Sequence, residues 1–177
     1  MLRKGGVPVD TDDLLIDAFE RVNGIVHRVV DGLTSHQLAF RPAGEANSIA
    51  WLVWHLTRIQ DDHVAGVALT EQVWTSEGWV ERFGLPCDPS DTGYGHQAQD
   101  VAAVRVESGE LLTGYYDAVH RRTTSFLQML SDGDLDRIVD DSWDPPVSLG
   151  VRLVSVLADD LEHAGQAAYV RGIIERS

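Results

Sequence analysis

The sequence predicts an all-α protein built as a four-helix bundle with a long connection between the second and third helices. Four stretches of about twenty residues carry the three-four spacing of apolar residues that is typical of amphipathic helices. Segments rich in Gly, Pro and Asp separate these stretches. At 177 residues the chain is long enough for one ordinary domain and too short for two, so we expect a single domain over residues 1–177.

The first expected helix runs from about Asp12 to Leu33. Its apolar residues form one buried stripe, and Gly24 interrupts that stripe at a modest cost of ~1 kcal/mol relative to Ala. The residues of the stripe are Leu14, Leu15, Ala18, Phe19, Val22, Ile25, Val26, Val29 and Leu33. A connector with Pro and Gly as helix breakers follows over residues 34–46.

The second expected helix runs from about Ile49 to Leu69, with Asn47 or Ser48 as its N-cap. Its first six residues, up to Trp54, are apolar nearly all round the helix. A helix of that kind is buried on most sides, so we expect this one at the centre of the bundle.

Residues 71–106 form the least regular part of the sequence. We expect Trp74, Trp79 and Phe83 in a short helix or across the bundle. Pro86, Pro89, Gly93 and Gly95 mark turns. A connection of this length is uncommon in a compact domain and is often functional, so it could cover the mouth of a pocket. We also expect the tryptophan-rich segment to be exposed and to offer a surface for dimer formation.

The third expected helix runs from about Ser108 to Leu130. Leu135 to Val139 is expected as a short turn or strand, and the Trp143-Asp-Pro-Pro segment as a rigid loop, because consecutive prolines exclude a helix. Ser148 is the expected N-cap of the last helix, which continues to about Ile174.

Charge and composition narrow the class of function. The formal net charge is −14, with 14 basic and 28 acidic residues, so the chain lacks the clustered Lys and Arg that nucleic acids or anionic membranes require. No apolar run approaches the roughly 20 residues that span a bilayer, and no signal peptide is visible. Cys87 is the only cysteine, so no internal disulfide can form. Together these features predict a cytoplasmic protein.

Among the seven histidines, His55 has the most unusual setting. It lies in the most apolar helix, where a buried polar group without a partner costs on the order of 1–3 kcal/mol. It is therefore either a metal ligand or a core histidine bonded to a neighbouring group. His27, His36 and His120 are expected as ordinary surface residues. His96, in the long connection, could reach a pocket but has no spaced partner in the sequence.

The last helix offers Asp159 and His163, which are four residues apart and therefore project from one face. Two ligands at this spacing can bind one metal. Asp62 and His63 are excluded as further ligands beside His55, because seven residues separate them by roughly 10 Å along the helix.

If the second and last helices face each other, they supply a two-histidine, one-carboxylate set with an open position, which is typical of catalytic rather than structural metal sites. The alternative is an ordinary solvated acidic face made of Asp159, Asp160 and Glu162.

The sequence resembles the DinB-like superfamily. The segments that carry the resemblance are Asn47–Leu56 with Asp61–Ala65 for the second helix, and Leu161–Gly172 for the last one. Asp91–His96 and Leu112–Tyr116 are similar to segments of the actinobacterial, mycothiol-dependent branch. The resemblance implies an up-down-down-up four-helix bundle that is frequently a homodimer.

The resemblance also implies a divalent metal, usually zinc or nickel, held by three histidines. The first and third of these match His55 and His163, whereas the position of the second is Asp159. A carboxylate can ligate zinc and favours harder ions, so manganese or iron are further candidates. The alternative outcome is a degenerate pocket without metal.

Characterised members of the superfamily are thiol S-transferases or mycothiol-dependent isomerases. The resemblance therefore implies a metal-dependent transferase that activates a low-molecular-weight, mycothiol-like thiol for attack on an electrophile in detoxification or thiol metabolism. Cys87 is expected to be structural, since the thiol arrives on the substrate. The alternatives are a metal-free small-molecule-binding or dimer-scaffold bundle and, third, metal-assisted hydrolysis at the same site.

Overall fold

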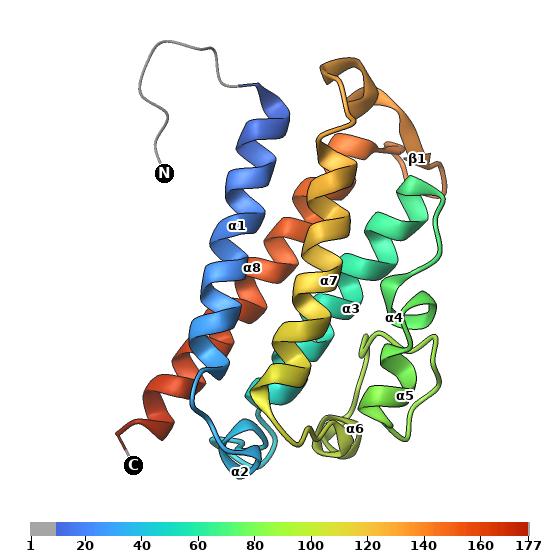
Figure 1. The fold of residues 1–177 in the computed structure, drawn as a ribbon. Coiled ribbons are helices and arrows are strands. Elements are labelled where there is room, and N and C mark those ends of the chain that lie inside the picture. Colours follow the sequence, from blue (N-terminus) through green and yellow to red (C-terminus); the bar gives the residue numbers. More distant parts are fainter. Residues whose placement is uncertain (1–9, 177) are drawn as a thin grey trace, which may run out of the picture.

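A computed structural model describes residues 10–176 and has the predicted four-helix bundle. Its long helices are α1 (Thr11–Val30), α3 (Ile49–Ala68), α7 (Gly109–Leu127) and α8 (Leu149–Ile174). In Figure 1, α1 and α8 run in one direction while α3 and α7 run in the other. The bundle is therefore up-down-down-up, and the long connection between α3 and α7 is what makes these two helices parallel.

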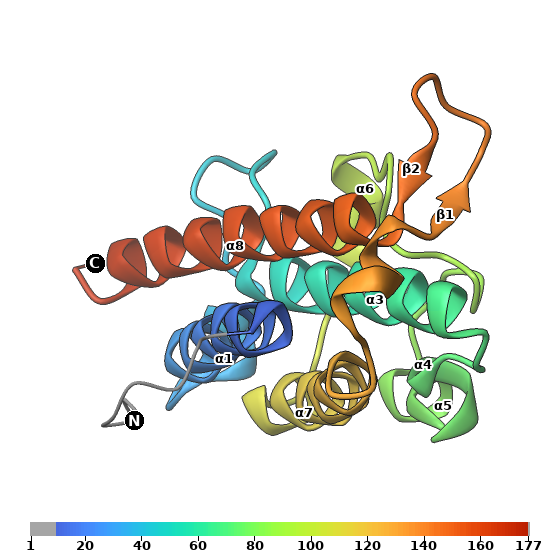
Figure 2. The same ribbon diagram turned by 90° about the horizontal axis from the view of Figure 1, so that it is seen from above.

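Short elements connect the long helices: α2 (Ser35–Leu38), α4 (Val73–Ser76), α5 (Trp79–Phe83), α6 (Ala98–Ala103), the 3-10 helix η1 (Asp132–Asp136), and strands β1 (Ile138–Asp140) and β2 (Val147–Ser148). The two strands form an antiparallel hairpin, with Ile138 opposite Ser148 and Asp140 opposite Val147. Figure 2 shows this hairpin projecting beside the first turn of α8. The turn or strand expected over Leu135–Val139 thus contains the end of η1 followed by β1.

The ends of the helices follow their capping residues. Ser48 accepts a hydrogen bond from the backbone N–H of Trp51 and begins α3, and Ser148 accepts one from Val151 and begins α8. Both N-caps, and the end of α8 at Ile174, agree with the sequence prediction. The first and third helices are each three residues shorter at their C-terminal ends than expected, because their last predicted residues lie in turns.

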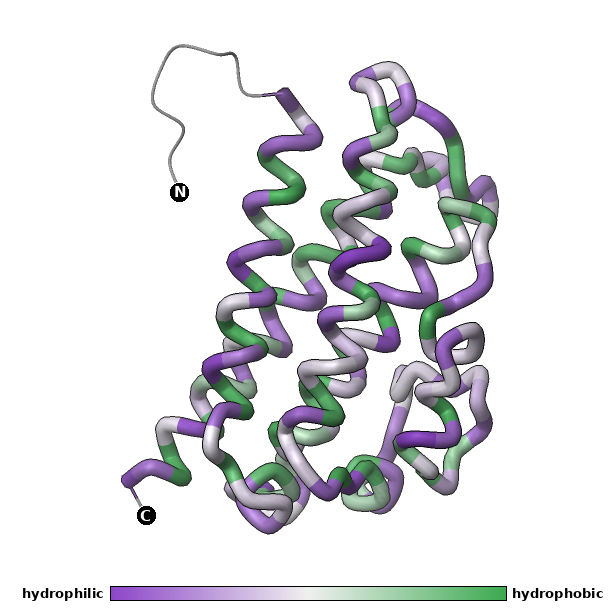
Figure 3. Tube along the Cα trace, viewed as in Figure 1, coloured by the Kyte–Doolittle hydropathy of each residue, from purple (hydrophilic) through white to green (hydrophobic). Residues whose placement is uncertain are grey.

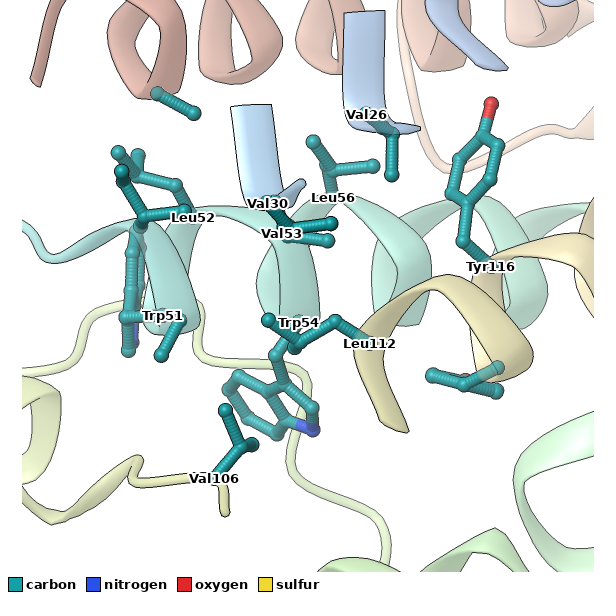
Figure 4. Close-up of a cluster of buried hydrophobic side chains, with 14 of the residues drawn as sticks. Val26, Val30, Trp51, Leu52, Val53, Trp54, Leu56, Val106, Leu112 and Tyr116 are labelled. Carbon is teal, nitrogen blue, oxygen red and sulfur yellow. The ribbon is translucent and has the colours of Figure 1, made fainter. Parts of the chain in front are cut away.

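The core is organised around α3. Figure 4 shows Val26 and Val30 of α1 and Leu112 of α7 converging on α3, where residues 49–58 are all buried. A second cluster at the other end of the bundle contains Phe19, Val64, Phe126, Leu127, Leu149, Leu153 and Val156. Unlike the buried start of α3, α1 carries apolar and polar residues in alternation along its length (Figure 3). None of the helices within residues 10–176 is long and apolar enough to cross a membrane.

A buried polar network fastens the long connection to α3. Asp61 accepts hydrogen bonds from the backbone N–H groups of Val73 and Trp74 and from the Tyr115 hydroxyl. Arg58, fully buried one turn earlier, donates to Gln72 Oε1, to the Tyr115 hydroxyl and to backbone carbonyls of residues 89 and 91. Burial raises the pKa of Asp61, against the lowering effect of these donors and of the Arg58 charge.

Two sequence expectations about exposure are wrong. Trp74 and Trp79 are only 2% and 7% exposed, because they pack with Phe83 and Tyr115 in an aromatic cluster, so the tryptophan-rich segment offers no dimer surface. His120, expected at the surface, is buried against the Tyr116 ring and bonds to Glu20. In each case a residue from another helix completes the burial, Tyr115 of α7 for the tryptophans and Glu20 of α1 for His120.

Candidate metal centre

The structure brings His55, Asp159 and His163 together. His55 comes from the buried part of α3. Asp159 and His163 come from successive turns of α8, on the face that lies against α3. One ligand-type atom from each of the three residues lies within 4.8 Å of the others. Asp62 and His63 lie outside this group, as the helical spacing predicts. Among residues 10–176 it is the only group of three or more His, Cys, Asp or Glu side chains close enough together to hold one metal ion.

His55 is oriented by its backbone partner and by an aromatic neighbour. Its Nδ1–H donates to the Thr92 carbonyl at 2.5 Å, which leaves Nε2 as the acceptor. The ring stacks on Trp51 with centroids 4.5 Å apart. Burial lowers the pKa of His55, the hydrogen bond to Thr92 opposes this shift, and the positive charge of His163 adds to it, so the net shift favours the neutral ring. Neutral imidazole is the form that ligates metals.

Gly93 is part of the site although the sequence marked it only as a turn residue. Its φ is +90°, and a Cβ at this position would lie 2.8 Å from His55 Nδ1 and 2.9 Å from a ring carbon of Trp54. Only glycine therefore lets the loop approach His55 closely enough for the Thr92 hydrogen bond. The sequence signals at Gly93 were its Gly-x-Gly loop and the resemblance of Asp91–His96 to the mycothiol-dependent branch, and neither says which side chain the loop contacts.

Asp159 and His163 meet one turn apart on α8. His163 Nε2 lies 3.6 Å from Asp159 Oδ1, and His163 Nδ1 donates to Gln166 Oε1 at 3.3 Å. Burial alone would lower the pKa of His163. The hydrogen bond and negative charge of Asp159, with help from Gln166 and Glu162, outweigh burial and raise this pKa above its ordinary value. The side chains of Asp159 and His163 are 33% and 16% exposed, so the site is open to solvent on the α8 side.

This donor set fits a divalent cation. Asp159 Oδ2 is buried and has no hydrogen-bond partner in the described part of the chain. Both imidazoles form a hydrogen bond through Nδ1 and so turn Nε2 into the site, where His163 Nε2 becomes a ligand once it releases the proton that faces Asp159. Bonds of about 2.1 Å in tetrahedral geometry place ligand atoms about 3.4 Å apart, close to the 3.6 Å between His163 and Asp159. The separations to His55, which reach up to 4.8 Å, would have to shorten when a metal binds.

His96 reaches the neighbourhood of the site without joining the group. Its Nδ1 accepts from Trp51 Nε1–H at 3.0 Å, and its Nε2–H donates to Asp91 at 2.9 Å. The ring also stacks on Trp54. His96 therefore holds the rings of Trp51 and Trp54 in place, and Trp51 in turn stacks on the candidate ligand His55.

Asp160 and Cys87 contrast with the three central residues. Asp160 is fully buried, and neither of its oxygens has a hydrogen-bond partner among residues 10–176, so an ordinary solvated acidic face is the wrong description of this residue. Burial, and then the Asp159 charge, raise its pKa well above the usual range. Burial also raises the pKa of the half-buried Cys87 thiol, which opposes thiolate formation.

Comparisons with known proteins agree with this geometry. The family model described as mycothiol-S-transferase matches residues 14–176. A solved structure, described as a conserved protein from Enterococcus faecalis, is similar with a TM-score of 0.88 and 28% identity, over 96% of this chain and 100% of that one. No functionally curated protein matches the chain significantly. Because this family model matches nearly the whole chain, the chain belongs to the mycothiol-S-transferase family, a branch of the DinB-like superfamily.

Proposed function

We propose that this protein is a metal-dependent thiol S-transferase whose metal ligands are His55, Asp159 and His163. The observation that carries the proposal is the convergence of three ligand-type atoms within 4.8 Å of one another, from two helices far apart in the chain. The family description supplies the thiol, a mycothiol-like cosubstrate. Zinc or nickel are the first candidates, with manganese or iron next because one ligand is a carboxylate.

Each residue has a distinct part in this chemistry. A divalent metal at an open three-ligand site supplies Lewis acidity that lowers the pKa of a thiol. The Thr92 carbonyl holds the His55 ring in the tautomer that presents Nε2, and Gln166 does the same for His163. Asp159 supplies the negative charge that reduces the net charge of a dication, and the Trp51 ring excludes water from one side of the site.

We further propose a homodimer of single-domain chains in the cytoplasm. The outward face of α8 supports the dimer, because Val151, Val154, Leu161 and Tyr169 are exposed there at 43–72%. They are separated by three, seven and eight positions, so they lie on one face of the helix. The dimer would therefore form on α8 rather than on the tryptophan-rich segment. Sedimentation of wild-type protein against a Val154→Glu and Leu161→Glu double variant tests this arrangement.

Metal analysis tests the proposed function directly. Protein purified without chelators or a metal-affinity tag is expected to hold about one equivalent of zinc, nickel, manganese or iron. His163→Ala should lose most of this metal, whereas His36→Ala, an exposed histidine outside the group, should retain it. Less than about a tenth of an equivalent, with no uptake on adding metal, would overturn the proposal. It would favour the metal-free binding bundle instead, in which His163 and Asp159 satisfy each other.

A thiol-consumption assay separates transfer from hydrolysis. The metal-loaded protein is incubated with mycothiol and a monochlorobimane-type electrophile, and both conjugate and remaining thiol are measured. The proposal expects conjugate formation that requires added thiol and is lost in His163→Ala. Turnover of the electrophile that does not depend on thiol would instead support metal-assisted hydrolysis.

A further inference from the structure

A charged groove of about 570 Å³ lies between the second half of α3, the first half of α8 and the β1–β2 hairpin. Its charged lining comes from all three: Asp62 and His63 of α3, Arg152 of α8, Asp140 of β1, and Arg137 just before β1. Figure 2 shows how the hairpin extends beyond the bundle beside α8 and so adds a wall that the helices alone would not provide.

The groove and the candidate metal centre share the same faces of the same two helices. Arg152 precedes Asp159 by seven residues, and Asp62 follows His55 by seven, which is close to two helical turns and roughly 10 Å. His63 links the two regions. Its Nδ1 lies 3.5 Å from Arg152 Nη1. Burial lowers the pKa of His63, the Arg152 charge lowers it further, and the charges of Asp62 and Asp159 raise it, so this ring is within electrostatic reach of both regions.

The carboxylates of the groove already accept hydrogen bonds from the protein, whereas Arg137 uses only part of its hydrogen-bond donors. Asp140 accepts from the backbone N–H and hydroxyl of Ser142 and from Arg152, and Asp62 accepts from a glutamine amide. Arg137 donates one N–H to the Val67 carbonyl and, within residues 10–176, forms no ion pair. Arg137 is exposed, and its charge contributes to lowering the pKa of Asp134 without forming an ion pair with it.

We infer that this groove binds a carboxylate of the substrate through Arg137 and Arg152, the latter roughly 10 Å along α8 from Asp159 of the metal centre. The inference rests on the proposed function only for what happens at the metal centre. A guanidinium fork matches a planar carboxylate, and each charge-assisted bond is stronger than a neutral one. A phosphate dianion fits less well, because it concentrates two negative charges on one group beside Asp62 and Asp140, whereas the charges of a carboxylate ligand lie singly on separate groups. The substrate class is thus a thiol, or an electrophile, with an acidic tail.

The first test uses the metal-free protein and needs no activity. The side-chain Nε–H signals of Arg137 and Arg152 are followed by 1H–15N NMR during titration with glutarate, and with the neutral glutaramide as control ligand. We expect saturable shifts with glutarate alone. Arg137→Gln, at an exposed position, should weaken glutarate about fivefold or more, and Arg105→Gln, an exposed arginine outside the groove, should leave the affinity unchanged. Non-saturating shifts, or equal effects of the two substitutions, would overturn the inference.

The second test measures the distance between groove and metal centre. The visible spectrum of the cobalt-loaded protein reports binding of 8-mercaptooctanoate, 3-mercaptopropionate and 8-mercaptooctan-1-ol. The eight-carbon acid covers the required roughly 10 Å, so it should bind about tenfold more tightly than either companion. Arg137→Gln and Arg152→Gln should remove most of that advantage, and Arg105→Gln should preserve it.

The two tests separate the inference from the proposed function. If the thiols bind but the eight-carbon acid has no advantage over the alcohol, the groove inference is overturned and the transferase proposal stands. If cobalt does not bind, the transferase proposal fails, and the glutarate titration of the metal-free protein alone decides whether the groove recognises a carboxylate.

Discussion

Replacing Gly93 by Ala is expected to damage the candidate metal centre without changing any proposed ligand. Gly93 has φ +90°, and an added Cβ would lie 2.8 Å from His55 Nδ1 and 2.9 Å from a Trp54 ring carbon. Neither neighbour can withdraw easily, because Trp54 is fully buried and His55 is stacked on Trp51. The loop must therefore move, and the bond from His55 to the Thr92 carbonyl is expected to break.

The size of the effect follows from these contacts. The left-handed backbone costs a non-glycine residue about 1–2 kcal/mol, and the lost hydrogen bond adds about 1 kcal/mol, so the free energy of unfolding should fall by about 2–3 kcal/mol. Loss of the partner that orients a ligand should weaken metal binding by about 10–100-fold. Gly95→Ala is the matched control. Gly95 has φ +78°, but no heavy atom lies within 4 Å of its added Cβ, so this substitution introduces the backbone strain alone.

Three measurements check this prediction. Urea denaturation gives the change in stability, competition with a chromophoric chelator gives the zinc affinity, and 15N NMR of the metal-free protein gives the tautomer of His55. Gly93→Ala should differ from Gly95→Ala in zinc affinity and should lose the Nδ1–H tautomer. If both variants bind zinc equally well and retain that tautomer, the argument that the Gly93 loop positions His55 is refuted.

Three further predictions concern the site and the core. Asp159→His should raise zinc affinity at least about tenfold in a chelator competition, because it completes a three-histidine set; an unchanged affinity would mean that position 159 does not ligate. In the metal-free protein the stability contributed by the raised pKa of His163 is present below the unfolded value of about 6.5 and is lost as pH rises through the folded-state value. Asp159→Asn should therefore lower the pKa of His163 in an NMR titration, and an unchanged or higher value would contradict the role of this carboxylate. Leu153→Ala should lower the free energy of unfolding by about 2–5 kcal/mol, since Leu153 is fully buried, whereas Leu14→Ala on α1, 61% exposed, should cost about 0.5 kcal/mol; similar losses in urea denaturation would show that the second core cluster is wrongly assigned.

The fold was largely predictable because its signals are local. Hydrophobic period, Ser caps and Gly or Pro breakers act over a few residues, so the ranges of the long helices agree with the structure to within three residues at each end. Exposure was less predictable. Trp74 and Trp79 lie in a segment without a clear apolar period, and their burial depends on Tyr115 of α7; His120 lies in a periodic helix, but its burial depends on how α7 packs beside Glu20 of α1.

The candidate site divides in the same way. Helical spacing alone placed Asp159 and His163 on one face and excluded Asp62 as a partner of His55, because the rise per residue fixes distances within a helix. That His55 faces this pair depends on how α3 and α8 pack against each other, which helical spacing by itself could not determine.

The sequence by itself therefore determined the helices, their caps and the residue types able to hold a metal, all through interactions within a few turns of chain. Only the tertiary structure decided how those residues are oriented. The hydrogen bond between His55 and Thr92 joins positions 37 residues apart, and the groove of Arg137 and Arg152 exists because a hairpin lies against two helices. Such contacts form only when distant segments pack together and exclude water, so no local pattern in the sequence records them.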